Sequence, residues 1–149
     1  MRAVVQRVSE ASVEVEGDVL AMIGKGVVVL LAVAEDDEDK DADYMASKLC
    51  HLRLFSDKEG RLNLSIRDVG GEILLISNFT VLGNTRKGHR PSYAKAAAAE
   101  EAEKFYNMIL ESLKGAGLLV FGGRFGAKMR VSLVNDGPVT LIVDSKQRR

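Results

Sequence analysis

The chain contains one uninterrupted apolar run, Val27-Val28-Val29-Leu30-Leu31-Ala32-Val33. β-Branched residues dominate this run, which is typical of a strand that is covered on both faces. We therefore expect it to form the central strand of a sheet. Upstream, the β-prone residues 3–8, the alternating residues 12–16 and residues 19–23 predict an antiparallel meander with one face toward solvent.

Two amphipathic helices are predicted downstream of the central strand. The first follows an acidic stretch at residues 35–43, which suits the positive end of a helix dipole, and its apolar positions are Ala42, Met45, Ala46, Leu49 and Leu52. The second helix is longer. It is expected to start from an N-cap at Ser92 and to stop at Lys114, before two nearby glycines.

The remaining strands complete the predicted architecture. Residues 52–55 and 62–66 should form a hairpin, and further strands are expected at residues 72–77, 118–121, 128–134 and 139–143. This order predicts an α/β fold of the mixed α+β type, with mixed and antiparallel sheets in layers and the two main helices packed on one side. A length of 149 residues is usual for one domain, so we expect a single domain over residues 1–149.

The composition argues against several classes of protein. Lysine plus arginine and aspartate plus glutamate each number 21, so the net charge is zero and indiscriminate binding to a polyanion is not expected. The single cysteine, Cys50, excludes an intramolecular disulfide and fits a reducing compartment. No apolar stretch is long enough to cross a bilayer, and the first residues are too polar for a signal peptide. We expect a soluble cytoplasmic protein that does not contact a membrane.

Positive charge is nevertheless concentrated locally. Residues 84–95 contain four cations and no acidic residue, residues 122–135 contain three more, and the chain ends with the basic tail Lys146-Gln147-Arg148-Arg149. Such segments are either solvated loops or local surfaces that bind phosphate groups. The sequence leaves both interpretations open.

The motifs of several common enzyme classes are missing from the sequence. His51 and His89 are the only histidines, and no Gly-x-Ser-x-Gly elbow is present, so a histidine-based triad is not expected. The sequence has no His-Glu-x-x-His motif and no cysteine pair, so we expect neither a metal nor a cofactor. Residues 122–126 are glycine-rich, but a strand pattern follows them where a phosphate-binding loop would open a helix, so we interpret them as a turn.

Two polar segments interrupt the apolar pattern. Ser77-Asn78-Phe79-Thr80 directly follows a buried strand, and is either an ordinary strand end or part of a site. Asn135-Asp136-Gly137-Pro138-Val139-Thr140 separates two strands, and its residue types favour a hairpin loop. The bond before proline also has access to the cis form, in which two adjacent carbonyls would form a rigid acceptor surface for an ammonium group.

Together, the two segments resemble the paired motifs of the D-aminoacyl-tRNA deacylase family. The resemblance covers essentially the whole chain, since other segments match in the same order: Met1-Arg2-Ala3-Val4-Val5-Gln6-Arg7-Val8, Arg86-Lys87-Gly88-His89-Arg90-Pro91-Ser92, Gly123-Arg124-Phe125-Gly126-Ala127 and Val131-Ser132-Leu133-Val134. One position departs from the pattern, because Asn78 stands where the family usually has glutamine. The shorter amide keeps its donor and acceptor but reaches about one methylene less far.

The resemblance implies a homodimeric hydrolase that cleaves the ester between a D-amino acid, or glycine, and the terminal adenosine of tRNA. In the family, the pair matched by Gly137 and Pro138 is cis and enters the active site of the neighbouring subunit. Its carbonyls take the substrate's α-ammonium group, and its backbone fills the space that an L side chain would need. Arg7 resembles the arginine that fixes this loop. The expected substrate-binding segment also includes Asn135, Val139 and Thr140.

For the reaction, the resemblance points to the first motif, and the expected catalytic residues are Ser77, Asn78, Phe79 and Thr80. Thr80 carries a hydroxyl that could act as a nucleophile, but an alcohol is weak without an adjacent base, and none is evident. We therefore favour substrate-assisted catalysis, which the resemblance also implies. A ribose hydroxyl of the terminal adenosine would help to activate water, while backbone amides around Phe79 and Thr80 hold the oxyanion.

The RNA part of the substrate has expected contacts of its own. By resemblance, Phe125 and Met129 flank the terminal adenine, and ordinary core packing is the alternative. Arg86, Lys87 and Arg90, with the basic tail, are expected to contact acceptor-stem phosphates.

Two other classes of function compete with the enzyme hypothesis. A noncatalytic RNA-binding module would bind D- and L-charged tRNA alike and leave both esters intact. A structural dimerisation domain would use Gly137 and Pro138 only as a turn and would have no pocket at residues 77–80.

Overall fold

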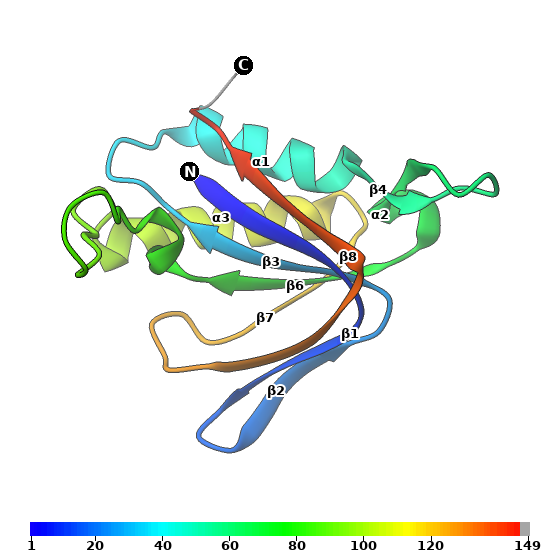
Figure 1. The fold of residues 1–149 in the computed structure, drawn as a ribbon, viewed down its shortest axis with the longest axis horizontal. Coiled ribbons are helices and arrows are strands. Elements are labelled where there is room, and N and C mark those ends of the chain that lie inside the picture. Colours follow the sequence, from blue (N-terminus) through cyan, green and yellow to red (C-terminus); the bar gives the residue numbers. More distant parts are fainter. Residues whose placement is uncertain (147–149) are drawn as a thin grey trace.

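The computed structural model describes residues 1–146 and has the mixed order of strands and helices that the sequence predicts (Figure 1). Its strands are β1 (Arg2–Val15), β2 (Asp18–Ile23), β3 (Gly26–Ala32), β4 (Arg53–Ser56), β5 (Leu62–Ser65), β6 (Glu72–Ser77), β7 (Leu119–Gly122) and β8 (Arg130–Asp144). Its helices are α1 (Asp39–His51), α2 (Ile66–Val69), the 3-10 helix η1 (Phe79–Leu82) and α3 (Ala99–Gly115).

The central strand is β3, as predicted. The main sheet has the order β2-β1-β3-β6-β7, in which β3 runs parallel to β6 and antiparallel to β1. Side chains of β3 enter two buried clusters: Val27, Val29 and Leu31 belong to one, and Val28 belongs to the other. A strand that is buried on both faces has no position for polar side chains, which explains the uninterrupted apolar run.

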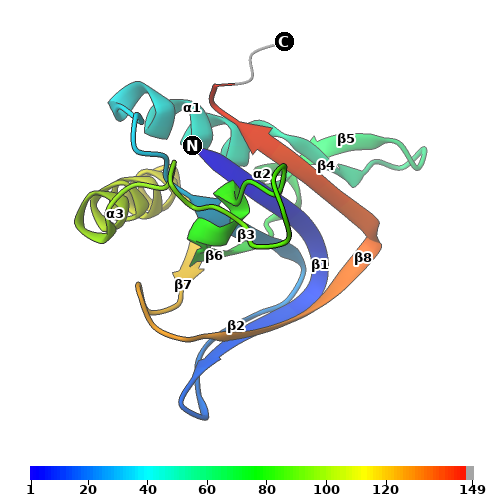
Figure 2. The same ribbon diagram turned by 60° about the vertical axis from the view of Figure 1, so that its left-hand side comes forward.

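Both main helices pack against the same face of this sheet (Figures 1 and 2), so that prediction is confirmed. Met45 of α1 and Ile109 and Leu113 of α3 are fully buried in the cluster that contains Val29. The apolar stripes at helical spacing face this core. The opposite face is covered by side chains from β2, from the first half of β8 and from the turn before it.

The structure corrects the predicted division of two strands. Residues 3–8 and 12–15 are parts of one long strand, β1, which pairs with β3 through its first half and with β2 through its second half. Residues 128–134 and 139–143 likewise belong largely to one strand, β8, and both halves of β8 pair with β1. The hairpin loop expected at residues 135–140 is therefore wrong.

A large bulge takes the place of that loop. Between the pairs Val8–Asn135 and Gln6–Thr140, β1 contributes only Arg7, whereas β8 contributes residues 136–139. The extra residues leave the ladder without ending it, because pairing resumes in both directions. The bulge therefore projects main chain from the middle of a long outer strand.

The predicted start of the second main helix is also wrong. Ser92 is no N-cap, because its backbone forms two hydrogen bonds with Asn84, and α3 begins only at Ala99. The intervening residues extend along the end of β3, where Ala97 N–H donates to the Val33 carbonyl. Backbone hydrogen bonds to Asn84 and Val33 thus outweigh the helix propensity of this alanine-rich segment. No helix within residues 1–146 has the length and apolar character needed to cross a membrane.

Candidate active site

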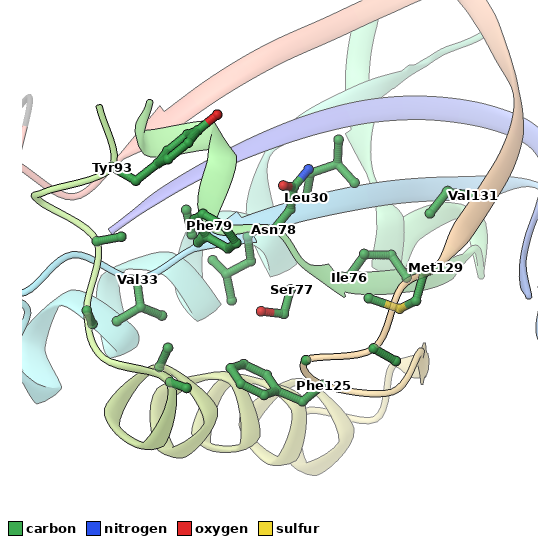
Figure 3. Close-up of a pocket in the computed structure, with 18 residues that line it drawn as sticks. Leu30, Val33, Ile76, Ser77, Asn78, Phe79, Tyr93, Phe125, Met129 and Val131 are labelled. Atoms are coloured by element: carbon green, nitrogen blue, oxygen red, sulfur yellow. The ribbon is translucent and has the colours of Figure 1, made fainter. Parts of the chain in front are cut away.

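A cavity of about 620 Å³ opens where β3 and β6 end (Figure 3). Its walls come from the ends of these strands, from the segment that leads into α3, and from the turn between β7 and β8. Five of the sequence-predicted site residues line the cavity: Ser77, Asn78, Phe79, Phe125 and Met129. The first polar segment is thus part of a cavity wall and does more than end a strand.

The polar segment turns sharply at the end of β6. Asn78 N–H donates to the Leu31 carbonyl at 2.8 Å, which continues the ladder with β3 for one residue before η1 begins. The Thr80 hydroxyl then donates to Asn78 Oδ1 at 2.5 Å. An amide oxygen cannot take up that proton, so this contact orients the hydroxyl without activating it.

The opposite wall of the cavity carries Phe125 and Met129, and Figure 3 shows Ser77 between this wall and Phe79. The ring of Phe125 packs on Tyr106, with centroids 6.1 Å apart. Tyr106 is itself buried, and its hydroxyl donates to the Leu75 carbonyl at 2.7 Å. Burial raises the pKa of Tyr106 to about 12, so the phenol stays a neutral support for Phe125 at physiological pH.

A glycine makes room for one side chain of this wall. A side chain at Gly123 would collide with Met129 Sδ, so the glycine leaves room for the thioether. The glycine-rich residues 122–126 end β7 and form a turn before β8, as the sequence predicts. They help to place an aromatic and a thioether side chain at the cavity.

The second polar segment is held by side chains around the bulge in β8. Arg7 Nε donates to the Asp136 carbonyl and Arg7 Nη1 donates to the Leu54 carbonyl, each at 3.0 Å. Within the segment, Asn135 Nδ2 donates to Thr140 Oγ1 at 2.9 Å, and Val139 N–H donates to Asn135 Oδ1 at 3.2 Å. The guanidinium group thus joins the bulge to β4.

The turn at the tip of this bulge is exposed to solvent. The peptide bond between Gly137 and Pro138 is cis, a choice that the sequence left open. Gly137 has a φ of 128°, and a Cβ there would lie 2.9 Å from Arg7 Nη2. Asp136, Gly137 and Pro138 are all exposed and do not line the cavity.

The structure therefore does not bring all predicted site residues together. Thr80 lies beside the cavity but outside its lining, and the lining also excludes Arg7, Asn135, Gly137, Pro138, Val139 and Thr140. Three residues of the first motif, Ser77, Asn78 and Phe79, line one cavity together with Phe125 and Met129, the two residues expected to flank the adenine. The second motif lies on another part of the same chain.

Residues 84–92, here called the basic loop, directly precede the segment that lines the cavity and leads into α3. Two backbone hydrogen bonds between Asn84 and Ser92 close it, and Asn84 Oδ1 accepts a further bond from Arg86 N–H. Arg86, Lys87 and Arg90 are exposed. In the basic tail, Lys146 forms an ion pair with Asp41 at 3.1 Å, and residues 147–149 lie outside the described residues.

No group of three or more histidine, cysteine, aspartate or glutamate side chains within residues 1–146 is arranged to hold a metal ion. The cavity thus offers backbone amides, two short polar side chains, aromatic rings and a thioether.

A family model described as D-Tyr-tRNA(Tyr) deacylase matches residues 4–144. The chain belongs to this deacylase family.

Individual relatives agree with the family assignment. D-aminoacyl-tRNA deacylases from Thermoanaerobacter sp. (strain X514) and Caldicellulosiruptor bescii are 50% and 52% identical to this chain over 147 residues, with 99% of each chain covered. A solved structure described as a c-Myc DNA unwinding element binding protein has a TM-score of 0.92 and 42% identity, covering 97% of this chain and 98% of its own.

A second solved structure, described as a probable eukaryotic D-amino acid tRNA deacylase, has a TM-score of 0.82 at 18% identity. It covers 96% of this chain and 98% of its own, and supports the fold alone. Together, the comparisons confirm the resemblance, the fold class and the enzyme class that the sequence predicts. The chain is a hydrolase of the D-aminoacyl-tRNA deacylase type.

Sequence reasoning missed one aromatic residue of the cavity. Tyr93 lines it and meets Phe79 edge to face, with ring centroids 5.2 Å apart and an interplanar angle of 83°. The small residues Ala96, Ala97, Ala99 and Ala102 also line the cavity, and all four fall within the helix that the sequence predicts from Ser92. An aromatic residue directly after a basic loop was the available signal, but the wrong helix start concealed it.

Proposed function

We propose that this chain removes D-amino acids, and glycine, from tRNA by hydrolysing the ester bond to the terminal adenosine. The observation that carries the proposal is the cavity in which Ser77, Asn78 and Phe79 lie across from Phe125 and Met129 (Figure 3). A largely apolar cavity with a few polar groups at one end has the character of a small-ligand site. A nucleoside ester would place its base beside Phe125 and Met129 and its ester beside the polar segment.

The ester would meet backbone donors at the start of η1. The first N–H groups of a helix have no acceptor within it, so those of Phe79 and Thr80 are available to an oxyanion. Preorganised donors of this kind act most strongly where charge develops in the transition state. An activated aminoacyl ester needs only modest additional help, which a ribose hydroxyl of the same adenosine would supply by helping to activate water.

In this mechanism Thr80 positions the substrate through Asn78, which lines the cavity, and does not attack the ester. Its hydroxyl donates to Asn78 Oδ1, which is no base. We expect Thr80→Ala to lower kcat/KM by about five- to tenfold, the loss of one ordinary hydrogen bond. Complete loss of hydrolysis in a variant that folds and binds substrate would favour the nucleophile instead.

The ribose contribution is tested on the substrate. An aminoacyl ester whose terminal adenosine lacks the neighbouring hydroxyl should not turn over, although it should still bind. Undiminished cleavage of such an ester would refute substrate assistance, whatever the result with Thr80→Ala.

Chiral selection is proposed to come from the second polar segment of a partner subunit. Gly137 and Pro138 are exposed and lie outside their own chain's cavity, so they are free to enter the cavity of another copy. Arg7 holds the segment through Asp136, while Asn135, Val139 and Thr140 are joined by side-chain hydrogen bonds. Main chain held in this way rejects an L side chain by occupying its space, and admits glycine because glycine has no side chain.

A homodimer is required for this arrangement, and exposed apolar residues on β8 support it. Ile142 is 68% exposed and Leu141 40% exposed, on the strand that carries the bulge. Successive side chains of a strand point to opposite faces, so the two do not form one patch, and Ile142, the more exposed, is the residue that a partner subunit is proposed to cover. Such contacts would bring the bulges of two copies toward each other's cavities.

The RNA would extend over the basic loop. Arg86, Lys87 and Arg90 are exposed next to the segment that lines the cavity, and they are proposed to contact acceptor-stem phosphates. Such a substrate is an intermediate of protein synthesis, which fits the predicted cytoplasmic location. No metal or other cofactor is needed for this chemistry.

The decisive experiment compares matched D- and L-aminoacyl-tRNA with the purified protein, following release of free amino acid. Rapid release from the D-ester with the L-ester intact is expected. Equal binding of both tRNAs without release would favour a noncatalytic RNA-binding module, and no effect on either would favour a structural dimerisation domain. A simple ester without adenosine separates a general esterase from the proposed enzyme.

A further inference from the structure

Phe79 and Tyr93 form an exposed aromatic pair at one side of the cavity (Figure 3). Phe79 is 55% exposed and Tyr93 38% exposed, although both rings also line the cavity. Large aromatic side chains usually contribute to stability by being buried, and these two leave much of that burial unused. Their exposure at the cavity therefore indicates a surface that a ligand covers.

The pair is built from two segments that the fold brings together. Phe79 opens η1, whereas Tyr93 follows the hydrogen-bonded pair of Asn84 and Ser92 at the base of the basic loop. A Cβ at Gly83 would lie 3.0 Å from both Tyr93 Cε1 and the Thr80 carbonyl oxygen. The absence of a side chain at Gly83 thus lets the ring of Tyr93 lie close to the backbone of η1.

The charge of the segment that carries Tyr93 indicates what kind of ligand covers the pair. Residues 84–95, which include Tyr93, contain Arg86, Lys87, Arg90 and Lys95 and no acidic residue. Aromatic rings beside cations are the usual combination in sites for single-stranded nucleic acid, where the bases stack and the cations follow the phosphates. An apolar protein surface would not form ion pairs with these cations.

We propose that Phe79 and Tyr93 form a stacking platform for the nucleobase that precedes the terminal adenosine. The proposal rests on the proposed deacylase function, in which the adenine itself lies across the cavity at Phe125 and Met129. The preceding nucleotide then leaves the cavity past the aromatic pair, and its phosphate faces the basic loop. Stacking is tolerant of base identity, so the platform adds affinity without reading the sequence.

The first measurement compares two substrates with one protein. The D-aminoacyl ester of adenosine contains only the terminal nucleoside, whereas the same ester of the trinucleotide cytidylyl-cytidylyl-adenosine includes the preceding base. For the wild type, kcat/KM should be higher with the trinucleotide. Tyr93→Leu keeps an apolar side chain but removes the ring, so it should reduce the ratio of the two kcat/KM values, by roughly 5- to 150-fold if the full stacking contribution is lost.

Two matched variants control this result. Tyr93→Phe keeps the ring and should keep the ratio. Tyr44→Leu removes a tyrosine ring from α1, outside the cavity lining, and should also leave the ratio unchanged. An unchanged ratio in Tyr93→Leu, or an equal loss with both esters, would overturn the platform; the second result would place Tyr93 at the aminoacyl or adenosine part of the substrate.

Equilibrium binding separates failure of the platform from failure of the proposed function. The uncharged trinucleotide and adenosine are each titrated into the protein, so no hydrolysis is required. Tighter binding of the trinucleotide that Tyr93→Leu abolishes supports the platform. Equal affinity of the wild type for the two ligands overturns it. A wild type that cleaves neither ester would refute the deacylase proposal alone, since the binding comparison would still decide the platform.

Discussion

Residues 77–80 and residues 135–140 both interrupt apolar strands with polar residues, but the fold places them differently. The first segment lies at the ends of two parallel strands and forms the wall of a cavity in its own chain. The second bulges from the middle of a long outer strand and exposes its tip to solvent. The first therefore has the form of a site that a ligand enters, whereas the second has the form of a group that enters a site.

The means of support differ as well. The first segment is held mainly by the sheet ladder, through the bond from Asn78 to Leu31. The second has left its ladder, and Arg7 supports it with two hydrogen bonds to backbone carbonyls. A bulge without such bonds would be mobile, and selection by shape requires a stiff surface. The comparison predicts that variants of the second segment alter chiral selection, whereas variants around the first alter turnover or binding.

Gly137→Ala should have the largest effect on chiral selection. A Cβ at this position would crowd Arg7 Nη2 and Val139 Cγ2, and the φ of 128° is unfavourable for alanine. Displacement of the tip should lower the ratio of D- to L-ester hydrolysis by about 100-fold, the scale of a 1 Å misplacement in an active site. The ratio is measured with matched D- and L-aminoacyl-tRNA.

Gly17→Ala is the matched control, because Gly17 also has a positive φ, of 84°, but no atom lies within 4 Å of its added Cβ. It should cost some stability and leave the D to L ratio intact. An unchanged ratio in a folded Gly137→Ala variant would contradict the proposal that the second segment selects the chirality of the substrate.

A second prediction concerns the anchoring of β8. Burial by itself would raise the pKa of Asp41, but hydrogen bonds from the Glu38 backbone, Ser145 and Lys146 outweigh it and lower the pKa to about 2, from a usual value of 3.8. The folded pKa lies below the unfolded one, so the stabilisation is present above about pH 4 and is lost as the pH falls toward 2. Asp41→Asn should cost about 2 kcal/mol of unfolding free energy at pH 7.

Urea denaturation at pH 7 and near pH 2 measures this difference, which should shrink on acidification. Asp43→Asn, an exposed change on the same helix, should have little effect at either pH. Equal stability of Asp41→Asn and the wild type at pH 7 would show that the ion pair with Lys146 does not anchor the end of β8.

Loss of one cation from the basic loop should have the smallest effect. Arg86→Ala or Lys87→Ala should weaken tRNA binding and reduce the salt dependence of the affinity by about one unit of slope per lost phosphate contact. The D to L ratio should not change, in contrast to Gly137→Ala. Binding is titrated at several salt concentrations, with Lys58→Ala on the exposed β4–β5 turn as the control. An unaltered slope in both variants would show that the basic loop does not contact the RNA.

Local sequence patterns predicted most elements because each pattern reflects a local physical constraint. The apolar run at residues 27–33 indicated β3, and the apolar stripes indicated both main helices. The patterns failed where distant partners decided the backbone conformation. Residues 92–98 looked helical, but hydrogen bonds to Asn84 and Val33 hold parts of them extended. Tyr93, hidden in that segment, was missed for this reason.

The layers of this protein and its two polar segments could be predicted from local sequence, because burial and turn chemistry are properties of neighbouring residues. The packing of distant strands made residues 135–140 a bulge, since a bulge forms here because β1 has one residue opposite four of β8. It also decided that Phe125 and Met129 share a cavity with residues 77–79. Such contacts join residues far apart in the chain, so their geometry follows from packing and from no local pattern.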